Sequence, residues 1–284
     1  MRSCLSIWKM ARNSYQCWLR SSKLIVLGVL LIFVRTQVVE PLQGCSLLME
    51  EKLSFLEPFV ALGNSGMVLL ILPLVYLVLM SGYPQKDGNE LFYFVRTGKR
   101  SWILGQIIFA VLSAISFIVF LLISSAALSI GNSEIRLEYS HAVTHFVSRY
   151  PERWGDYAAQ MIPQNLYNHI SLKTACFHSI LLLFFYFLLL ALILLMFTIW
   201  KKRYLGLFVN GFLIIAGAVG CSGNTAWMWM FPMPHTISWF HYTEYLQEPI
   251  MSMKVSYLYF LVLDLLLLVL CFLSAKRLQV EEIG

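Results

Sequence analysis

Six long apolar runs constrain the fold of this chain more than any other feature. About 20 apolar residues in a helix cross the hydrocarbon core of a bilayer, which is roughly 30 Å thick. The runs are continuously apolar and do not alternate with a period of two, so a transmembrane β-barrel is not expected. They cover residues 24–39, 59–81, 102–130, 177–200, 205–221 and 257–275. The sequence therefore predicts an all-α polytopic membrane protein with six transmembrane helices and one transmembrane domain over residues 1–284.

The distribution of Lys and Arg predicts the orientation of these helices. With six spans, 14 of the 21 Lys and Arg fall on the side that holds both termini, and six fall on the opposite side. Cytoplasmic loops carry such an excess, so we expect both termini in the cytoplasm of a cell membrane. The net charge of +6 is then a topology signal, and nothing in the sequence indicates nucleic-acid binding.

The first 23 residues are expected to form a helix that lies in the membrane interface. At helical spacing its residues form two faces: Trp8 belongs to an apolar face and Lys9 to a basic face. Two such faces are typical of interfacial helices. The alternative is a secretory signal peptide with its apolar core at 24–34. The long leading segment, the charge of Arg35 and the lack of a small-residue cleavage site argue against it.

Two segments between the runs are unusually long or aromatic. The outer segment, residues 131–176, is expected to hold helices near 134–149 and 160–173. The hairpin segment, residues 224–249, is too apolar for a solvated loop and too broken by proline to span, so we expect a re-entrant hairpin before the last span. An ordinary amphipathic outer loop is the alternative. The residues expected to shape an outer gate here are Trp227, Trp229, Phe231, Pro232, Pro234 and Trp239.

Several single residues within the runs carry expectations of their own. In the second run, Gly63 and Gly66 predict close helix packing, and Pro73 predicts a kink. Arg35 and Asp264 are ionisable residues inside spans, where such side chains are costly and often functional. Counting from the span ends puts both at a similar depth. We expect the two to approach each other, within one chain or across a dimer; the alternative is that Arg35 extends outward and Asp264 faces a wet cavity.

The six cysteines and six histidines give no strong metal or catalytic pattern. No CxxC spacing is present, and although Cys45 and Cys221 share the predicted outer side, unpaired cysteines are expected. His141 and His145 are four residues apart, but Ala142 stands where a zinc protease needs glutamate, so no metal site is predicted. The string at Gly98 lacks the residues of a phosphate-binding loop, so the chain is not expected to hydrolyse ATP.

The loop at 82–101 joins the second and third runs and is polar and basic. Its stretch 89–97 suits a short amphipathic helix against the cytoplasmic face. A plain surface loop that carries only the topology signal is the alternative. The candidate docking residues for a cytoplasmic partner are Asn89, Glu90, Leu91, Phe92, Phe94, Arg96, Lys99 and Arg100.

The order of these segments resembles the membrane subunits of ABC transporters of the type-two exporter class. Residues 91–122 are similar to a permease pattern, R-x-G-x-R-x-x-W, that opens the third span. Arg96, Gly98 and Arg100 match it, and Trp102 stands one residue nearer than the pattern requires. The resemblance covers most of the chain in topology and about 30 residues in sequence. The outer segment, residues 131–176, is a departure from many members of this class.

The resemblance implies a function in transport. A dimer of identical or sister permease chains would bind two separate ATP-binding cassette subunits, which supply ATP and magnesium chemistry that this chain lacks. Residues 89–100 would be the coupling segment, and the hairpin segment would shape the outer gate. The implied substrate is a peptide, an antibiotic or a lipid-like molecule, with export or import left open.

Two other functions stay open. A polytopic membrane enzyme would use Glu138, His141 and His145 on the outer side. A sensor or immunity protein would bind a ligand with the outer segment and need no ATPase.

Overall fold

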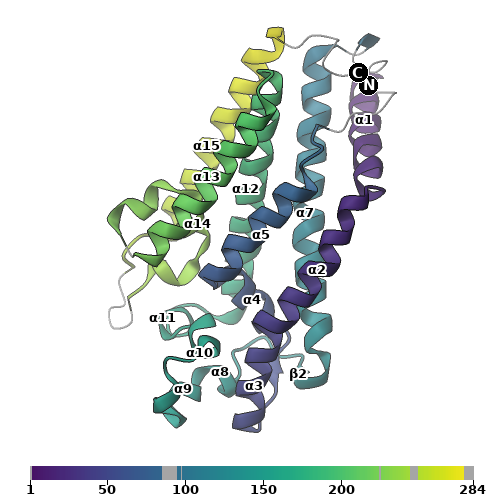
Figure 1. The fold of residues 1–284 in the computed structure, drawn as a ribbon. Coiled ribbons are helices and arrows are strands. Elements are labelled where there is room, and N and C mark those ends of the chain that lie inside the picture. The colour runs from purple at the N-terminus through teal and green to yellow at the C-terminus, as the bar shows by residue number, and fades with distance from the viewer. Residues whose placement is uncertain (1, 85–94, 97, 224, 244–248, 278–284) are drawn as a thin grey trace.

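The protein is an elongated bundle of long helices, with a cluster of short elements at one end (Figure 1). The computed structural model describes residues 2–84, 95–96, 98–223, 225–243 and 249–277. Within these residues, five helical stretches are long and apolar enough to cross a membrane, or six if one bent pair counts as a single span. They are Ser22–Met49, Lys99–Asn132, Leu172–Ile199, Arg203–Ser222 and Met253–Lys276, with Glu57–Asn64 and Gly66–Leu79 as the bent pair. The prediction of a helical membrane protein is confirmed.

The outward faces of these helices are apolar. On α13 (Arg203–Ser222), Phe208 and Phe212 are exposed, and on α15 (Met253–Leu273), Leu258 and Leu265 are exposed. Large apolar side chains in such rows are costly in water and are at no disadvantage against lipid. The surface therefore agrees with a bilayer around the bundle.

The first span is longer than predicted. The helix α2 (Ile25–Val34) continues through a π-helical turn (η2, Arg35–Val39) into α3 (Glu40–Met49). We expected an end near Glu40 and Pro41. Proline is tolerated here because it lies in the first turn of α3, where the wider π turn precedes it.

The helix α1 (Arg2–Leu19) runs alongside α7 (Lys99–Ser129) and leads into α2 (Figure 1). The Tyr15 hydroxyl lies 2.6 Å from the Ser116 hydroxyl, and the Trp18 indole N–H donates to the Leu79 carbonyl at 3.1 Å. The N-terminal helix is therefore present and held by packing. Its placement in a membrane interface stays a prediction.

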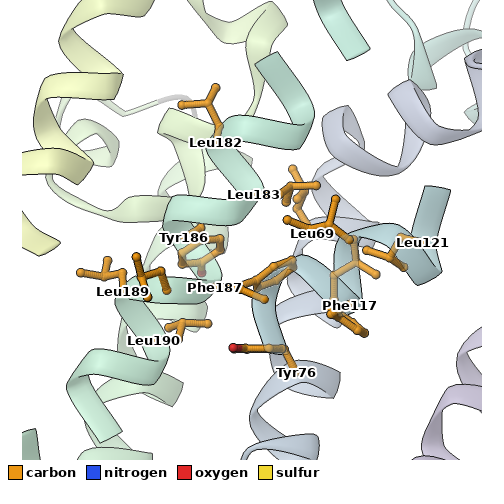
Figure 2. Packing of buried hydrophobic residues seen from close by; sticks show 14 of the residues in the cluster. Leu69, Tyr76, Phe117, Leu121, Leu182, Leu183, Tyr186, Phe187, Leu189 and Leu190 are labelled. Carbon is orange, nitrogen blue, oxygen red and sulfur yellow. The ribbon is translucent and has the colours of Figure 1, made fainter. Parts of the chain in front are cut away.

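The centre of the bundle is α12 (Leu172–Ile199), which is buried along most of its length. Aromatic rings from three helices meet there, Tyr76 of α5 (Gly66–Leu79), Phe117 of α7 and Phe187 of α12 (Figure 2). Their centroids lie 4.9 to 5.5 Å apart. The Tyr76 hydroxyl also lies 2.9 Å from that of Ser113, so this core is both packed and hydrogen-bonded.

Only residues 201–204 separate the fourth and fifth apolar runs, which predicts a tight turn and an antiparallel pair of helices. The structure confirms this: α12 ends at Ile199, and α13 begins at Arg203 and runs antiparallel to it (Figure 1). The last span, α15, runs in the same direction as α12. The contact between His178 and Tyr257 lies near the first ends of α12 and α15, and the Trp200 indole N–H donates to the Ser274 hydroxyl, 2.8 Å away, at their other ends. The helices α12, α13 and α15 thus form one half of the bundle.

The outer segment is less helical than predicted. Residues Ser133–Glu134 form strand β2, which pairs in parallel with β1 (Leu53–Ser54), so the expected helix over 134–149 is wrong at its start. Glu134, the first residue of the expected helix, has an extended backbone in this strand and so is not helical. The 3₁₀ turn η3 (Ile130–Asn132) precedes β2. Short helices and one more 3₁₀ turn follow β2: α8 (His141–Thr144), α9 (Phe146–Arg149), η4 (Pro151–Arg153), α10 (Tyr157–Met161) and α11 (Gln164–Tyr167). The helix expected over 160–173 is likewise divided between α10, α11 and the start of α12.

Cys45, Cys176, Cys221 and Cys271 form no disulfide among the described residues. Cys45 and Cys221 are both free, so the disulfide considered between them does not form.

Candidate functional site

The second span is broken at Ser65, and this break is the centre of the candidate site. The helix α4 (Glu57–Asn64) ends at Asn64, Ser65 has an extended backbone, and α5 begins at Gly66. The axes of α4 and α5 differ by 84°. The expected kink at Pro73 stays a prediction, because α5 continues through that residue as a helix with proline inside it. The break at Ser65 is a larger distortion that the sequence did not indicate.

Close packing explains one of the two glycines beside the break. A Cβ atom added to Gly63 would lie 2.7 Å from the Ser179 Cβ atom on α12, so only glycine allows this approach. A Cβ atom at Gly66 would meet no other atom within 4 Å. The predicted close packing therefore holds at Gly63, while Gly66 faces open space.

The Asn64 side chain joins three elements at the break. Its Nδ2 group donates to the Val60 carbonyl at 2.8 Å and to the Ser179 hydroxyl at 3.2 Å. Its Oδ1 atom accepts the Ser238 backbone N–H at 2.9 Å. The Asn64 carbonyl, which the break frees from the helix, accepts the Trp239 indole N–H at 2.8 Å. One buried residue thus satisfies the broken helix and holds the hairpin segment to it.

The described part of the hairpin segment consists of three short turns. They are η5 (Ala226–Met230), α14 (Pro232–Thr236) and η6 (Ser238–His241). Residues 232–238 are buried against the helices α12, α13 and α15, so this part of the segment is packed. An amphipathic outer loop that packs one face stays the alternative to a re-entrant hairpin. Insertion of the segment into the membrane stays a prediction.

The residues expected at an outer gate have different surroundings. Trp227 is exposed, Trp229 and Phe231 are partly buried, and Pro232 and Pro234 are fully covered. Trp239, the sixth, is the one that reaches the broken span. The described structure therefore brings one of the six to the break at Asn64.

An open cavity of about 540 Å³ lies at the break. The broken span contributes Asn64 to Met67, the outer segment contributes Tyr157 and Gln160, and the hairpin segment contributes Trp239. The Tyr157 hydroxyl lies 3.2 Å from that of Ser65. All residues that line the cavity are uncharged, and three of them are aromatic. A cavity of this size with aromatic walls and a few amide groups suits a neutral ligand.

The outer segment is fixed beside the cavity by Glu57, the first residue of α4. Its buried carboxylate accepts the Ser54 N–H at 2.8 Å, the Ser140 N–H at 2.6 Å and the Ser140 hydroxyl at 3.0 Å. Three donors on one carboxylate tie α4, β1 and the start of α8 together. Burial raises the pKa of the nearby Tyr139 hydroxyl, and the Glu57 charge adds to that shift.

The expected pairing of Arg35 with Asp264 does not form within the chain. Arg35 Nε lies 3.1 Å from Glu40 Oε1, and both side chains are more than half exposed. Asp264 lies on the buried face of α15, and neither of its carboxylate oxygens has a hydrogen-bond partner among the described residues. The π turn between Arg35 and Glu40 explains the first pairing, because it brings residues five apart to one face. A contact across a dimer stays a prediction.

The outer histidines form a pair of their own. The Nδ1 atoms of His141 and His145 lie 3.2 Å apart on an exposed turn. In the described part of the chain, no group of three or more His, Cys, Asp or Glu side chains is arranged to hold a metal ion.

Most of the predicted coupling segment lies outside the described residues, including Asn89, Glu90, Leu91, Phe92 and Phe94. The described part is exposed at Val95 and Arg96. Gly98 has a φ of 84°, a conformation that favours glycine, and α7 begins directly after it. The Lys99 ammonium donates to the Lys276 carbonyl at 3.2 Å. This bond joins the first residue of α7 to the residues that follow the end of α15.

The sequence did not single out Asn64, Ser238 or the buried histidines His235 and His241. The signal available for Asn64 was a polar residue between two glycines inside an apolar run. Nothing local distinguishes the histidines, because their partners lie on other helices.

Comparisons of the chain with models of protein families, with curated proteins and with solved structures find no match. The structure therefore defines a helical membrane protein with five or six candidate spans, and the function rests on the geometry of the site.

Proposed function

We propose that this chain is the transmembrane subunit of an ATP-driven transporter of the ABC type-two exporter class. The observation that carries the proposal is the broken second span beside an open cavity. At the break, the Asn64 backbone carbonyl and the Asn64 side chain form hydrogen bonds with the hairpin segment. Non-helical backbone inside a membrane bundle is tolerated where protein covers it or where it lines a cavity, and broken helices mark substrate sites in transporters. The hairpin segment is then the outer gate.

The cavity favours a substrate with a neutral, ring-bearing or lipid-like part. Its walls carry Trp154, Tyr157 and Trp239 together with uncharged amides, so burial of a charge there would be costly. Neutral peptides, antibiotics and lipid-like molecules all meet this condition. Export is the proposed direction.

The helix α7 offers a mechanical link between the coupling segment and the gate. It is continuous over 31 residues, a length of about 46 Å, and it leads directly through η3 into β2. A displacement of residues 89–100 by an ATPase would move α7 as a rod. Its contacts with Tyr76 and Tyr15 would carry that motion to α5 and α1.

The experiment is purification of the tagged chain in mild detergent, with ATP hydrolysis as the readout. The wild type is expected to retain a stoichiometric ATPase, and Leu91→Asp combined with Phe94→Asp is expected to lose it. The matched control is Ile135→Asp with Leu137→Asp, because both side chains are exposed on the outer segment at the opposite end. Retention of the ATPase by the first double variant would contradict the coupling segment.

A ligand sensor or immunity protein is the second candidate, because the outer segment itself lines the cavity. It predicts tight ligand binding and full activity in cells without any ATPase partner. The membrane-enzyme alternative would need His141 for activity, so an active His141→Ala variant would exclude it.

A further inference from the structure

A second buried polar cluster lies between the hairpin segment and α15, apart from the cavity. The Ser256 hydroxyl oxygen lies 2.8 Å from His235 Nδ1 and 2.7 Å from His241 Nε2. All three side chains are buried, and they belong to α15, α14 and η6. One hydroxyl therefore bridges two imidazoles.

The other nitrogen of each imidazole faces a backbone carbonyl, which fixes its tautomer. His235 Nε2 lies 2.8 Å from the Trp229 carbonyl, and His241 Nδ1 lies 3.1 Å from the Ile237 carbonyl. A carbonyl only accepts, so these two nitrogens carry protons. The two nitrogens that face Ser256 are consequently lone pairs when both imidazoles are neutral.

The four contacts need one more proton than the neutral cluster contains. Two protons serve the carbonyls, and the Ser256 hydroxyl proton serves one imidazole at a time. The remaining contact, shorter than 2.9 Å, then joins two lone pairs. A fourth proton on the second imidazole converts this contact into an N–H···O hydrogen bond to the Ser256 oxygen. The cluster can therefore accept one added proton, and that proton is then donated in a hydrogen bond.

We propose that His235, Ser256 and His241 form a buried proton-binding site that makes docking of the hairpin segment depend on outer pH. His235 is the imidazole that takes the proton. Its ring stacks on Tyr259 with centroids 4.0 Å apart, and a ring face of this kind stabilises a cation. Trp229 packs by its edge against both imidazoles, at 5.3 and 5.2 Å.

Burial opposes the added charge and sets the direction of the effect. Both histidines lie between the spanning helices, and burial lowers the pKa of His241 to about 4, although its bond to the Ile237 carbonyl raises it. Burial also lowers the pKa of His235, against its bond to the Trp229 carbonyl. In the undocked segment the histidines are solvated and bind a proton more tightly than when they are buried. Docking is therefore favoured at pH values above the ordinary histidine pKa of 6.5, and it weakens as the pH falls below that value.

The surroundings contain no opposing carboxylate in ionic contact among the described residues. The titratable side chains around the cluster are Tyr257, Tyr259 and the exposed Lys254 on α15, His178 and Tyr186 on α12, and Cys221 on α13. Asp264 shares the buried face of α15 but lies eight residues further along, about 12 Å. Glu244 and Glu248 lie outside the described residues. His178 is thus a nearby histidine outside the cluster.

The test is magnetic resonance of histidine-labelled protein in lipid, without any ATPase, over pH 8 to 4. We expect His235 as the Nε2–H tautomer and His241 as the Nδ1–H tautomer at pH 7.5. One imidazolium should form at His235, with a midpoint below the ordinary histidine pKa of 6.5. Resonances are assigned with His235→Gln and His241→Gln. The control is His178→Gln, which removes a neighbouring imidazole outside the cluster and should not lower the midpoint.

Loss of the bridging hydroxyl is the decisive change. Ser256→Ala should lower the midpoint by about one pH unit or more, because the cation loses its acceptor, whereas Ser256→Thr should preserve it if the alanine variant does not fold. Three results would overturn the proposal. They are a midpoint that does not change in Ser256→Ala, titration of His235 at the ordinary histidine pKa of 6.5, and tight Zn²⁺ binding by both imidazoles at pH 7.5. Because no ATPase is present, none of these results bears on transport.

Discussion

Replacement of Asn64 by leucine should release the hairpin segment from the broken span. The change keeps a side chain of similar size and removes both hydrogen bonds of Nδ2 and the one that Oδ1 accepts from the Ser238 N–H. Ser238 is fully buried, so bulk solvent does not reach its N–H to replace this acceptor. A buried group left unsatisfied costs about 1–3 kcal/mol, and the two hydrogen bonds of Nδ2 are lost with it, so we expect destabilisation of about 3 kcal/mol.

Hydrogen–deuterium exchange of the peptide 226–241 measures this effect directly. Where exchange reports the local opening equilibrium, about 3 kcal/mol corresponds to roughly 100-fold faster exchange of the Ser238 amide. The matched control is Asn210→Leu. Asn210 is equally buried, but within the described part of the chain its side chain makes one hydrogen bond, to the Leu190 carbonyl, and its Oδ1 atom has no partner there. The control should alter stability by less than about 1 kcal/mol and leave the peptide unchanged.

Equal exchange in wild type and Asn64→Leu would refute the reasoning. The amide would then not hold the hairpin segment, and the break at Ser65 would need another explanation. Equal effects of Asn64→Leu and Asn210→Leu would show that loss of any buried amide is enough, which would also remove the argument for a specific junction.

Other substitutions test the packing around the same junction. Gly63→Ala should lower the thermal unfolding midpoint, because the added Cβ atom would lie 2.7 Å from Ser179. Gly66→Ala should leave the midpoint unchanged, and equal midpoints of the two variants would contradict this packing. Gly66→Phe should fill the cavity and abolish binding of a neutral dye such as Nile red without unfolding the protein, and unaltered binding would place the ligand elsewhere. Glu57→Leu should expose the outer segment to limited proteolysis, since Ser54 and Ser140 lose their acceptor; an unchanged cleavage pattern would contradict that role.

The helices of this protein were predictable because membrane spans are specified by length and composition alone. Each predicted run coincides with a helical stretch, since the bilayer requires every backbone group to be satisfied inside the helix. The turn at 200–204 was predictable for the same reason, because only a few residues separate two runs. The extension of the first span to Met49 was not, because a π turn at Arg35 has no clear signal in the sequence.

The break in the second span shows where local reasoning fails. Pro73 is the stronger helix breaker by propensity, yet the helix ends at Asn64. The Asn64 carbonyl and side chain find partners on the hairpin segment and on Ser179, more than 100 residues away in the sequence. Such a break is stabilised by tertiary contacts that no window of residues contains.

The expectation that Arg35 and Asp264 pair within one chain was wrong for a geometric reason. Depth in the membrane can be counted along a span, but the direction of a side chain depends on how the helices rotate against one another. Arg35 is exposed beside Glu40, while Asp264 is directed into the bundle. The same limit hid His235 and His241, whose shared partner Ser256 lies on a different element.

The most direct measurement of the central claim is the ATPase content of the purified complex. The account predicts that the tagged wild-type chain, extracted in mild detergent, carries a separate ATP-hydrolysing subunit in stoichiometric amount, and that Leu91→Asp with Phe94→Asp removes it while the control at Ile135 and Leu137 does not. A wild-type chain that transports its substrate in reconstituted vesicles with no ATP-hydrolysing partner would contradict it.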